Sequence, residues 1–354
     1  MARERVVLYC PDENIRLSVD RLETLPTGGG KSAILRLGYS WAELGHQVII
    51  ACALATPGKK GRLAIADFPV ESVPGDVAVF VTGSRGHFQG WWEAASHAAV
   101  KIFWINGPNR VTPPPTKLDW IVAPAQFLAQ KAIVEWGFPA EKVVVIRGES
   151  ADPCGGLARL QRRNPYQGIF LSHPAKGLDQ ALFLFEKMRV RFPQIRLHVL
   201  GSERLWGDQK MVEYRPLPQG ALFLGEKPPL AVSRLLPGYG FLLYLSPVID
   251  GFSSATAEAM AAGLIVFAAA HGSNAELISH GQNGFLIPLK QGLPDLEVAE
   301  RLLGAYLQNP EAWNPLRAAA SKQIPSWRSQ AVLWRKLWRR CWSSPLATRD
   351  SRCR

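Results

Sequence analysis

Two carboxylates eight positions apart, Asp250 and Glu258, are the side chains of this sequence with the clearest capacity for chemistry. Asp250 follows the apolar run 241–246, which predicts a strand, and Glu258 lies in the small-residue segment 254–262, which predicts a short helix. Both carboxylates can therefore reach one ligand in a crevice at the strand end. Carboxylates accept hydrogen bonds from sugar hydroxyls. A metal site is less favoured, because no His or Cys stands at ligand spacing around the pair.

The residues between the two acids suit the same crevice. Gly251, followed by Phe252, allows the backbone to approach a ligand closely. Ser253 and Ser254 precede the helix, where they can cap it or donate to a phosphate. The alternative is a capped helix with an incidental surface acid.

Gly28, Gly29 and Gly30 form a second candidate site, before a predicted helix at 31–46. A Walker A motif is excluded, because it needs a glycine at position 25, which is Leu25. A nicotinamide site is not favoured, because the triplet lies well beyond the end of its strand and no acid closes the second strand. A flexible loop remains possible. The other interpretation is a glycine loop whose amides approach an anionic ligand at a helix N-terminus.

The arrangement of predicted elements positions these residues. The 354 residues exceed the roughly 250 that one core usually holds, which predicts two domains. Apolar runs without clean alternation are interleaved with helical patterns, which indicates α/β domains with parallel, doubly wound sheets. Such sheets bind ligands at the carboxyl ends of their strands. The expected boundaries are a first domain at 1–152, a linker at 153–166, a second domain at 167–324, a terminal helix at 325–342 and a basic tail at 343–354.

Composition limits the cellular setting and the partners. The net charge of +12 favours anionic partners, and residues 325–354 hold eight Arg or Lys against one acid, so about seven of these charges lie there. Five scattered cysteines without a CxxC motif fit a reducing compartment. The N-terminal residues lack the apolar region of a signal peptide, and no run is long enough to span a membrane. We expect a cytoplasmic protein.

The segment 250–288 resembles the signature of GT-B glycosyltransferases of group 1, or family 4, a retaining family that uses nucleotide sugars. The resemblance rests on two acids separated by seven residues, then a small-residue helix, a strand and two glycine turns. Further matching positions are Ala259, Met260, Gly263, Gly272, Glu276, Gly281 and Gly284. Lys176, in KGL after a predicted strand, resembles the diphosphate-binding lysine of the family.

The resemblance implies two Rossmann-like domains facing across a cleft, and transfer of a sugar from a nucleotide-diphosphate sugar to an acceptor, with retention. Lys176 would neutralise the departing diphosphate, helped by helix N-terminal amides near 251–254. Asp250 would hold the transferred sugar and Glu258 the ribose. The loop 28–30 would close on the donor from the first domain, where a glycan, lipid or small-molecule acceptor would bind. No metal or cofactor is expected.

Four positions depart from the family pattern. Asp250 is one methylene shorter than the usual Glu, and Leu171 and Ser172, beside His173, stand where an Arg usually helps to hold the diphosphate. Asn106 stands where a His is common, and His87 is a candidate substitute. These departures keep open a degenerate GT-B protein that binds nucleotide or a partner without turnover. A nucleotide-sugar epimerase or phosphorylase on the same fold is a further alternative.

The terminal helix carries an aromatic face and basic residues. Its apolar face is formed by Trp327, Ala331, Trp334, Trp338 and Cys341. Its charges are Arg328, Arg335, Lys336, Arg339 and Arg340. Such a helix can lie peripherally on an anionic membrane. The favoured interpretation is that the Trp face docks on the protein, as in the family, where a terminal helix crosses back to the first domain. No recognition motif accompanies the charge, so nucleic acid is not an expected partner.

Overall fold

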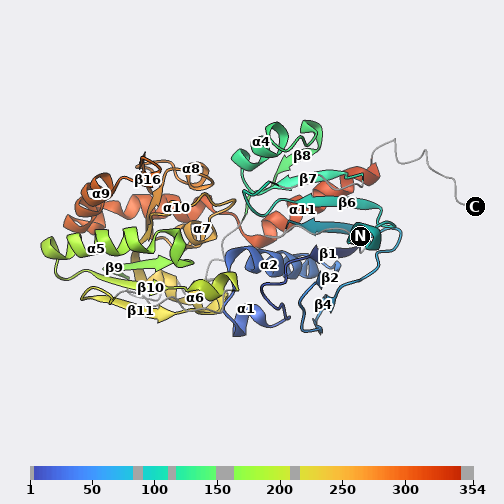
Figure 1. Ribbon diagram of the computed structural model, residues 1–354, viewed down its shortest axis with the longest axis horizontal. Helices are drawn as coiled ribbons and strands as arrows, with labels where there is room; N and C mark the ends of the chain where they lie inside the picture. The colour runs from blue at the N-terminus through green and yellow to red at the C-terminus, as the bar shows by residue number, and fades with distance from the viewer. Residues whose placement is uncertain (1–3, 83–90, 111–116, 149–162, 208–215, 344–354) are drawn as a thin grey trace, which may run out of the picture. The chain divides into compact units, whose positions relative to one another are not determined.

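The computed structural model describes residues 4–82, 91–110, 117–148, 163–207 and 216–343, and within these ranges the chain forms two compact units. Unit 1 contains the described residues of Met1–Val19, Ile34–Arg147 and Trp327–Arg354. Unit 2 contains those of Asp20–Ala33 and Gly148–Ser326. Each unit is built around one sheet (Figure 1).

Unit 1 has an eight-stranded sheet in the order β3-β4-β2-β1-β5-β6-β7-β8, parallel except where β3 pairs with β4. The strands are β1 Arg5–Cys10, β2 Gln47–Cys52, β3 Gly58–Lys60, β4 Leu63–Asp67, β5 Val77–Val81, β6 Val100–Trp104, β7 Trp120–Ala123 and β8 Val143–Val145. The helices are α2 Gly29–Glu43, which begins in unit 2, α3 Trp91–Ala94, η1 Ala140–Lys142, α4 Gln126–Val134 and α11 Trp327–Ser343.

Unit 2 has a six-stranded parallel sheet in the order β11-β10-β9-β12-β13-β14. The strands are β9 Asn164–Leu171, β10 Arg196–Leu200, β11 Ala221–Gly225, β12 Tyr239–Tyr244, β13 Ile265–Ala269 and β14 Phe285–Ile287, followed by the hairpin of β15 Leu289–Lys290 and β16 Leu293–Pro294. The helices are α1 Arg21–Thr24, η3 Pro174–Lys176, α5 Leu178–Arg191, η4 Glu203–Trp206, α6 Pro229–Leu235, η5 Leu236–Gly238, α7 Ser254–Ala261, α8 Asn274–Leu277, α9 Leu296–Gln308, η6 Pro310–Trp313 and α10 Asn314–Gln323.

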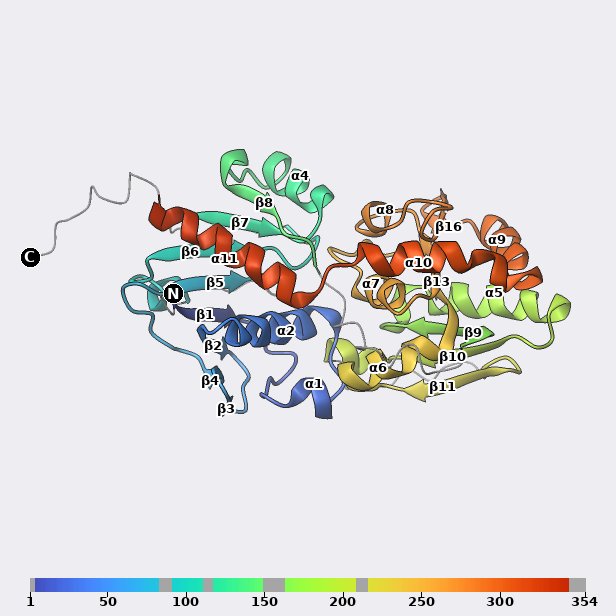
Figure 2. The same ribbon diagram turned by 180° about the vertical axis from the view of Figure 1, so that it is seen from behind.

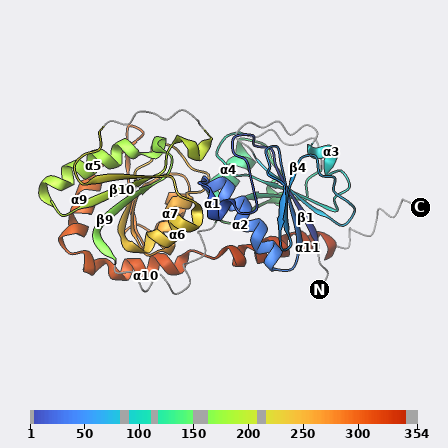
Figure 3. The same ribbon diagram turned by 90° about the horizontal axis from the view of Figure 1, so that it is seen from below.

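Strand β12 shows why the unit 2 sheet reads as continuous apolar sequence. Successive side chains of a strand point to opposite faces. Phe241 and Leu243 pack into the core under α5 and α9, whereas Leu242 and Tyr244 pack into the core under α6, α7 and α10. Figure 3 shows α5 on one side of this sheet and α6, α7 and α10 on the other. Because both faces are covered, the prediction of a parallel α/β sheet is confirmed.

The terminal helix α11 packs within unit 1 on helix α2 (Figure 2). The rings of Trp334 and Trp338 lie 5.6 and 5.4 Å from the ring of Trp41, edge to face. The Arg339 guanidinium lies 2.7 Å from the Glu4 carboxylate. The tryptophan face is therefore buried against the protein, as the docking interpretation predicted.

The compact units differ from the predicted boundaries at one place. Residues 20–33, expected in the first domain, pack with unit 2, whereas the terminal helix packs with unit 1, the side on which it was expected. This difference has a steric cause: the glycine loop approaches η4 and α7 so closely that a Cβ at Gly28 would lie 2.6 Å from the Leu205 carbonyl oxygen. Position in the sequence alone did not indicate this packing.

Candidate functional site

Three loops of unit 2 carry the candidate residues, and each follows the carboxyl end of a strand. The turn 173–176 follows β9, the loop 245–253 follows β12 and the turn 270–273 follows β13. These strands are neighbours in the order β9-β12-β13 and run parallel, so their loops meet at one edge of the sheet. The topology thereby brings Lys176 and Asp250 together.

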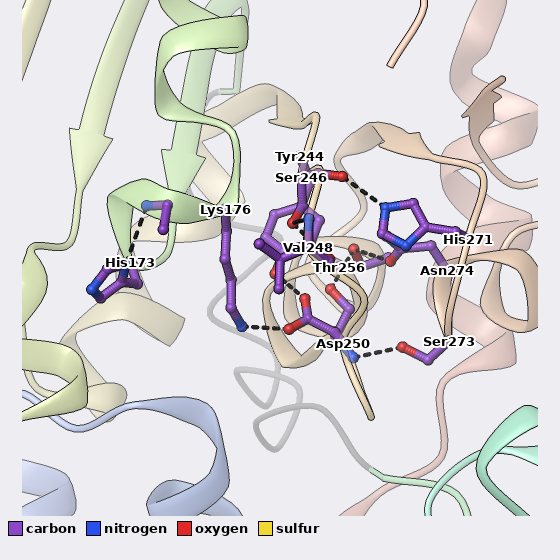
Figure 4. Close-up of polar contacts among 12 residues, drawn as sticks. His173, Lys176, Tyr244, Ser246, Val248, Asp250, Thr256, His271, Ser273 and Asn274 are labelled. Atoms are coloured by element: carbon purple, nitrogen blue, oxygen red, sulfur yellow. Dashed lines mark hydrogen bonds and ion pairs between the residues drawn. The ribbon is translucent and has the colours of Figure 1, made fainter. Parts of the chain in front are cut away.

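Lys176 and Asp250 form a buried ion pair (Figure 4). The Lys176 Nζ lies 2.7 Å from Asp250 Oδ1, and the two side chains are 17% and 12% exposed. The Tyr244 hydroxyl donates to the other carboxylate oxygen, Oδ2. The Lys176 ammonium also lies 5.7 Å from the centre of the Trp206 ring, within the range of a cation–π contact.

The surroundings set the charge of this cluster. Burial acts to lower the pKa of Lys176, but Tyr244 and the Asp250 carboxylate outweigh it, so the net pKa is raised and the ammonium stays charged. Burial, reinforced by the negative charge of Asp250, raises the pKa of Tyr244. The phenol therefore remains a hydrogen-bond donor at neutral pH, and the site presents the Lys176 ammonium beside the Asp250 carboxylate.

A glycine holds the lysine turn against the next strand. Gly177 follows Lys176 with φ of +96°, a conformation that L side chains rarely adopt. A Cβ at this position would lie 2.2 Å from the Leu245 carbonyl oxygen, directly after β12. The KGL sequence therefore allows the close approach that brings the lysine to the β12 loop.

Hydrogen bonds order the loop that leads into α7 (Figure 4). The Ser273 hydroxyl accepts from the Ser253 backbone N–H at 2.8 Å. The Ser253 hydroxyl donates to Thr256 Oγ1 at 2.9 Å, and the Thr256 hydroxyl donates to Asn274 Oδ1 at 2.8 Å. Ser253 therefore makes no side-chain capping bond to the α7 backbone. Its hydroxyl joins α7 to the loop after β13, and this network fixes the helix N-terminus.

A pocket that is partly open to solvent lies beside α7 and entirely within unit 2. Predicted site residues Gly28, Gly29, Ser254 and Glu258 line it. The other lining residues are Thr27, Ser32, Leu171, Leu200, Gly201, Leu205, Glu226, Lys227, Pro229, Ala255 and Val232. Its wall combines apolar side chains with a few charged groups, as the walls of small-molecule sites do.

Close contacts shape the glycine wall of this pocket. A Cβ at Gly29 would lie 2.0 Å from Ser254 Oγ, so only glycine allows the loop to reach the N-terminus of α7 in this way. Gly30 is exposed and is not among the lining residues of this pocket. Two of the three predicted glycines thus meet the two predicted residues of α7, Ser254 and Glu258, in one cavity.

The remaining predicted residues lie elsewhere. Gly251 is buried and Phe252 is half-buried, with its ring against Gly148. Asn106 lies in unit 1, where its backbone N–H donates to Thr82 Oγ1 at 2.7 Å. His87 lies outside the described residues.

His173 stacks on a tryptophan that sequence reasoning missed. Its ring lies 3.6 Å from the ring of Trp206 at an interplanar angle of 14°. His173 Nδ1 accepts from the Ala175 backbone N–H at 3.1 Å, which leaves the proton of the neutral ring on Nε2. Trp206 ends η4, which follows β10, and only its place beyond the VLGS sequence signalled it.

The described ranges hold neither a candidate membrane span nor a candidate metal cluster. No helix there is long and apolar enough to cross a membrane. No group of three or more His, Cys, Asp or Glu there is arranged to hold a metal ion.

The comparisons with known proteins concern the second half of the chain and the whole fold. Residues 172–322 match the model of a family described as Glycosyl transferases group 1. A comparison with curated protein sequences finds no match.

Among solved structures, a glycosyltransferase from Rickettsia africae has a TM-score of 0.70 and 12% identity, covering 97% of this chain and 100% of its own. HepE from Anabaena, solved with UDP-glucose, has a TM-score of 0.67 and 15% identity. The match covers 96% of this chain and 100% of the HepE chain. Sucrose-phosphate synthase from Thermosynechococcus elongatus has a TM-score of 0.71 and 12% identity. The match covers 96% of this chain and 100% of the synthase chain. These similarities confirm the predicted GT-B fold.

Proposed function

We propose that the chain is a glycosyltransferase, because residues 172–322 match the model of Glycosyl transferases group 1 and the whole chain has the GT-B fold. A nucleotide-diphosphate sugar gives up its sugar, with retention of configuration, to a glycan, lipid or small-molecule acceptor. The complex of HepE with UDP-glucose supports a nucleotide sugar as the donor.

The observation that carries this proposal is the pocket beside α7. Glu258 lines it, and a carboxylate accepts hydrogen bonds from a pair of ribose hydroxyls. The backbone N–H groups at the start of α7 and the glycine loop around Gly29 provide donors and positive potential for an anionic group. We therefore assign the pocket to the nucleoside diphosphate.

The ion pair supplies the chemistry at the transferred sugar. Charge develops on the diphosphate as the glycosidic bond breaks, and a fixed cation stabilises that charge best. Lys176 is that cation in our proposal, and Asp250 accepts hydrogen bonds from the sugar hydroxyls. A lysine and a helix N-terminus together supply positive charge, so we propose a metal-independent reaction without a cofactor.

A donor screen tests the proposal. The chain is incubated with UDP-, GDP- and ADP-sugars, and thermal stabilisation and release of the nucleoside diphosphate are measured with and without EDTA. We expect one base to stabilise the protein and to give turnover that EDTA leaves unchanged. Neither stabilisation nor turnover with any of the three bases would contradict the proposal.

One observation favours a second candidate, a protein that binds nucleotide without turnover. Lys176 and Asp250 already satisfy each other at 2.7 Å, and Leu171 and Ser172 supply no second cation. If the pair does not open, the diphosphate gains no lysine. Stabilisation by a nucleotide sugar without release of the diphosphate, across a panel of acceptors, would identify this alternative.

The exposed face of α11 supports a peripheral association with an anionic membrane from the cytoplasmic side. Its tryptophan face is buried, so the contact in this proposal is electrostatic. Lys336 and Arg340 are exposed on it. Vesicles containing phosphatidylserine should retain the protein at low salt, whereas the variant Lys336→Glu/Arg340→Glu and neutral vesicles should not. Equal retention of both proteins would contradict this contact.

A further inference from the structure

The buried tyrosine at the end of β12 is a polar group that the proposed function leaves without a task. Tyr244 is fully buried in the core under α6 and α7, among apolar side chains. A buried hydroxyl without a partner is costly, and this one donates to Asp250 Oδ2. Phenylalanine would fill the same space in the core, so the hydroxyl serves the carboxylate.

The two oxygens of Asp250 have different partners. Oδ1 faces the Lys176 ammonium at 2.7 Å, and Oδ2 accepts from Tyr244 (Figure 4). Two partners on opposite oxygens fix the rotation of the carboxylate about its last bond. Tyr244 belongs to the rigid strand β12, whereas Lys176 ends a flexible side chain. The tyrosine is therefore the fixed partner and the lysine the movable one.

This asymmetry matters when an anionic ligand arrives. If Lys176 turns from Asp250 to a diphosphate, the Oδ1 atom of Asp250 loses the ammonium that it faced. A hydrogen bond from Tyr244 then keeps Asp250 in place. The side chain of Asp250 is short, and the phenol reaches it across the loop 245–249 from inside the core.

We propose that Tyr244 is a positioning residue, which holds the Asp250 carboxylate while Lys176 moves to the diphosphate of the donor. This inference rests on the proposed function. It predicts that the tyrosine acts on the chemical step through Asp250 and leaves the nucleotide pocket around Glu258 unchanged, because Tyr244 does not line that pocket.

Steady-state kinetics of Tyr244→Phe test the proposal. We expect kcat to fall about tenfold, the effect of one hydrogen bond to a charged group, with KM for the donor within about twofold. The matched control is Tyr239→Phe, at the other end of β12, which loses a hydroxyl contact to His198 at 2.8 Å. It should keep kcat within about twofold.

A longer acid separates positioning from a general structural role. Asp250→Glu adds one methylene and should collide with the Tyr244 hydroxyl, so alone it lowers kcat. Combined with Tyr244→Phe, the longer acid fills the space of the lost hydroxyl, and kcat should exceed that of either single variant. Single losses that multiply in the double variant, or an unchanged kcat in Tyr244→Phe, would overturn the proposal.

An unfolding measurement decides the case in which the chain turns over no donor, so that the failure of the proposed function remains distinguishable. Tyr244→Phe should lower the thermal midpoint of the wild type. In the Asp250→Ala background the same change removes a hydroxyl that has lost its carboxylate partner, so it should lower the midpoint by less than in the wild type. Equal decreases in both backgrounds would refute the link between the two residues.

Discussion

The contact between the glycine loop and α7 gives a sharp prediction for Gly29→Ala. The new Cβ would lie 2.0 Å from Ser254 Oγ and 3.1 Å from Ser254 Cβ. Rotation of the serine relieves the first contact but not the second, so the loop must also retreat from the pocket. Overpacking of this kind costs about 1–3 kcal/mol. If the cost appears when the pocket forms around a ligand, affinity falls about tenfold for each 1.4 kcal/mol.

The assay is calorimetric titration with the nucleoside diphosphate of the base that the donor screen selects. We expect Gly29→Ala to weaken binding about tenfold. Ser254→Ala removes the nearer atom, so the loss caused by Gly29→Ala should be smaller in that background. Gly107→Ala is the matched control, because a Cβ there meets nothing within 4 Å. Wild-type affinity in Gly29→Ala, or the same loss in both backgrounds, would refute the packing of the loop on α7.

Two further predictions concern the ribose contact and the terminal helix. Glu258→Gln should reduce the preference for a ribonucleotide over its 2′-deoxy form by about tenfold in Kd, because the carboxylate loses its charge and one acceptor oxygen; an unchanged preference would remove Glu258 from the ribose contact. Trp338→Ala should lower the free energy of unfolding in urea by about 3–5 kcal/mol, because the ring is fully buried 5.4 Å from Trp41. Trp342→Ala, at a position 38% exposed, should change it by about 0.5 kcal/mol or less, and equal losses in the two variants would contradict the docking of α11.

Much of the fold could be predicted because its signals are local. Strands such as β12 are buried on both faces and therefore read as unbroken apolar runs. The small-residue helix with Glu258, and the turn with Lys176 and Gly177, have distinctive residue types at fixed spacing. A parallel sheet then brings their strand ends to one edge without further information.

The missed features depend on contacts between distant parts of the chain. Tyr244 ends an apolar strand and looks like core from the sequence, and only the fold shows its hydroxyl at Asp250. The loop at Gly28 precedes a helix that continues into unit 1, so no local pattern places the loop with unit 2. The spacing of apolar residues along the chain does not predict contacts between distant segments.

Transfer by the Lys176→Ala variant tests the central claim most directly. The donor that gives turnover with the wild type is used, and release of the nucleoside diphosphate is followed at saturating concentration. The control is Lys187→Ala, which breaks an exposed ion pair to Glu300 at 3.3 Å in the same unit. We predict that kcat falls about 100-fold or more in Lys176→Ala and stays at the wild-type value in Lys187→Ala. Full activity in a folded Lys176→Ala protein would contradict the assignment of this site.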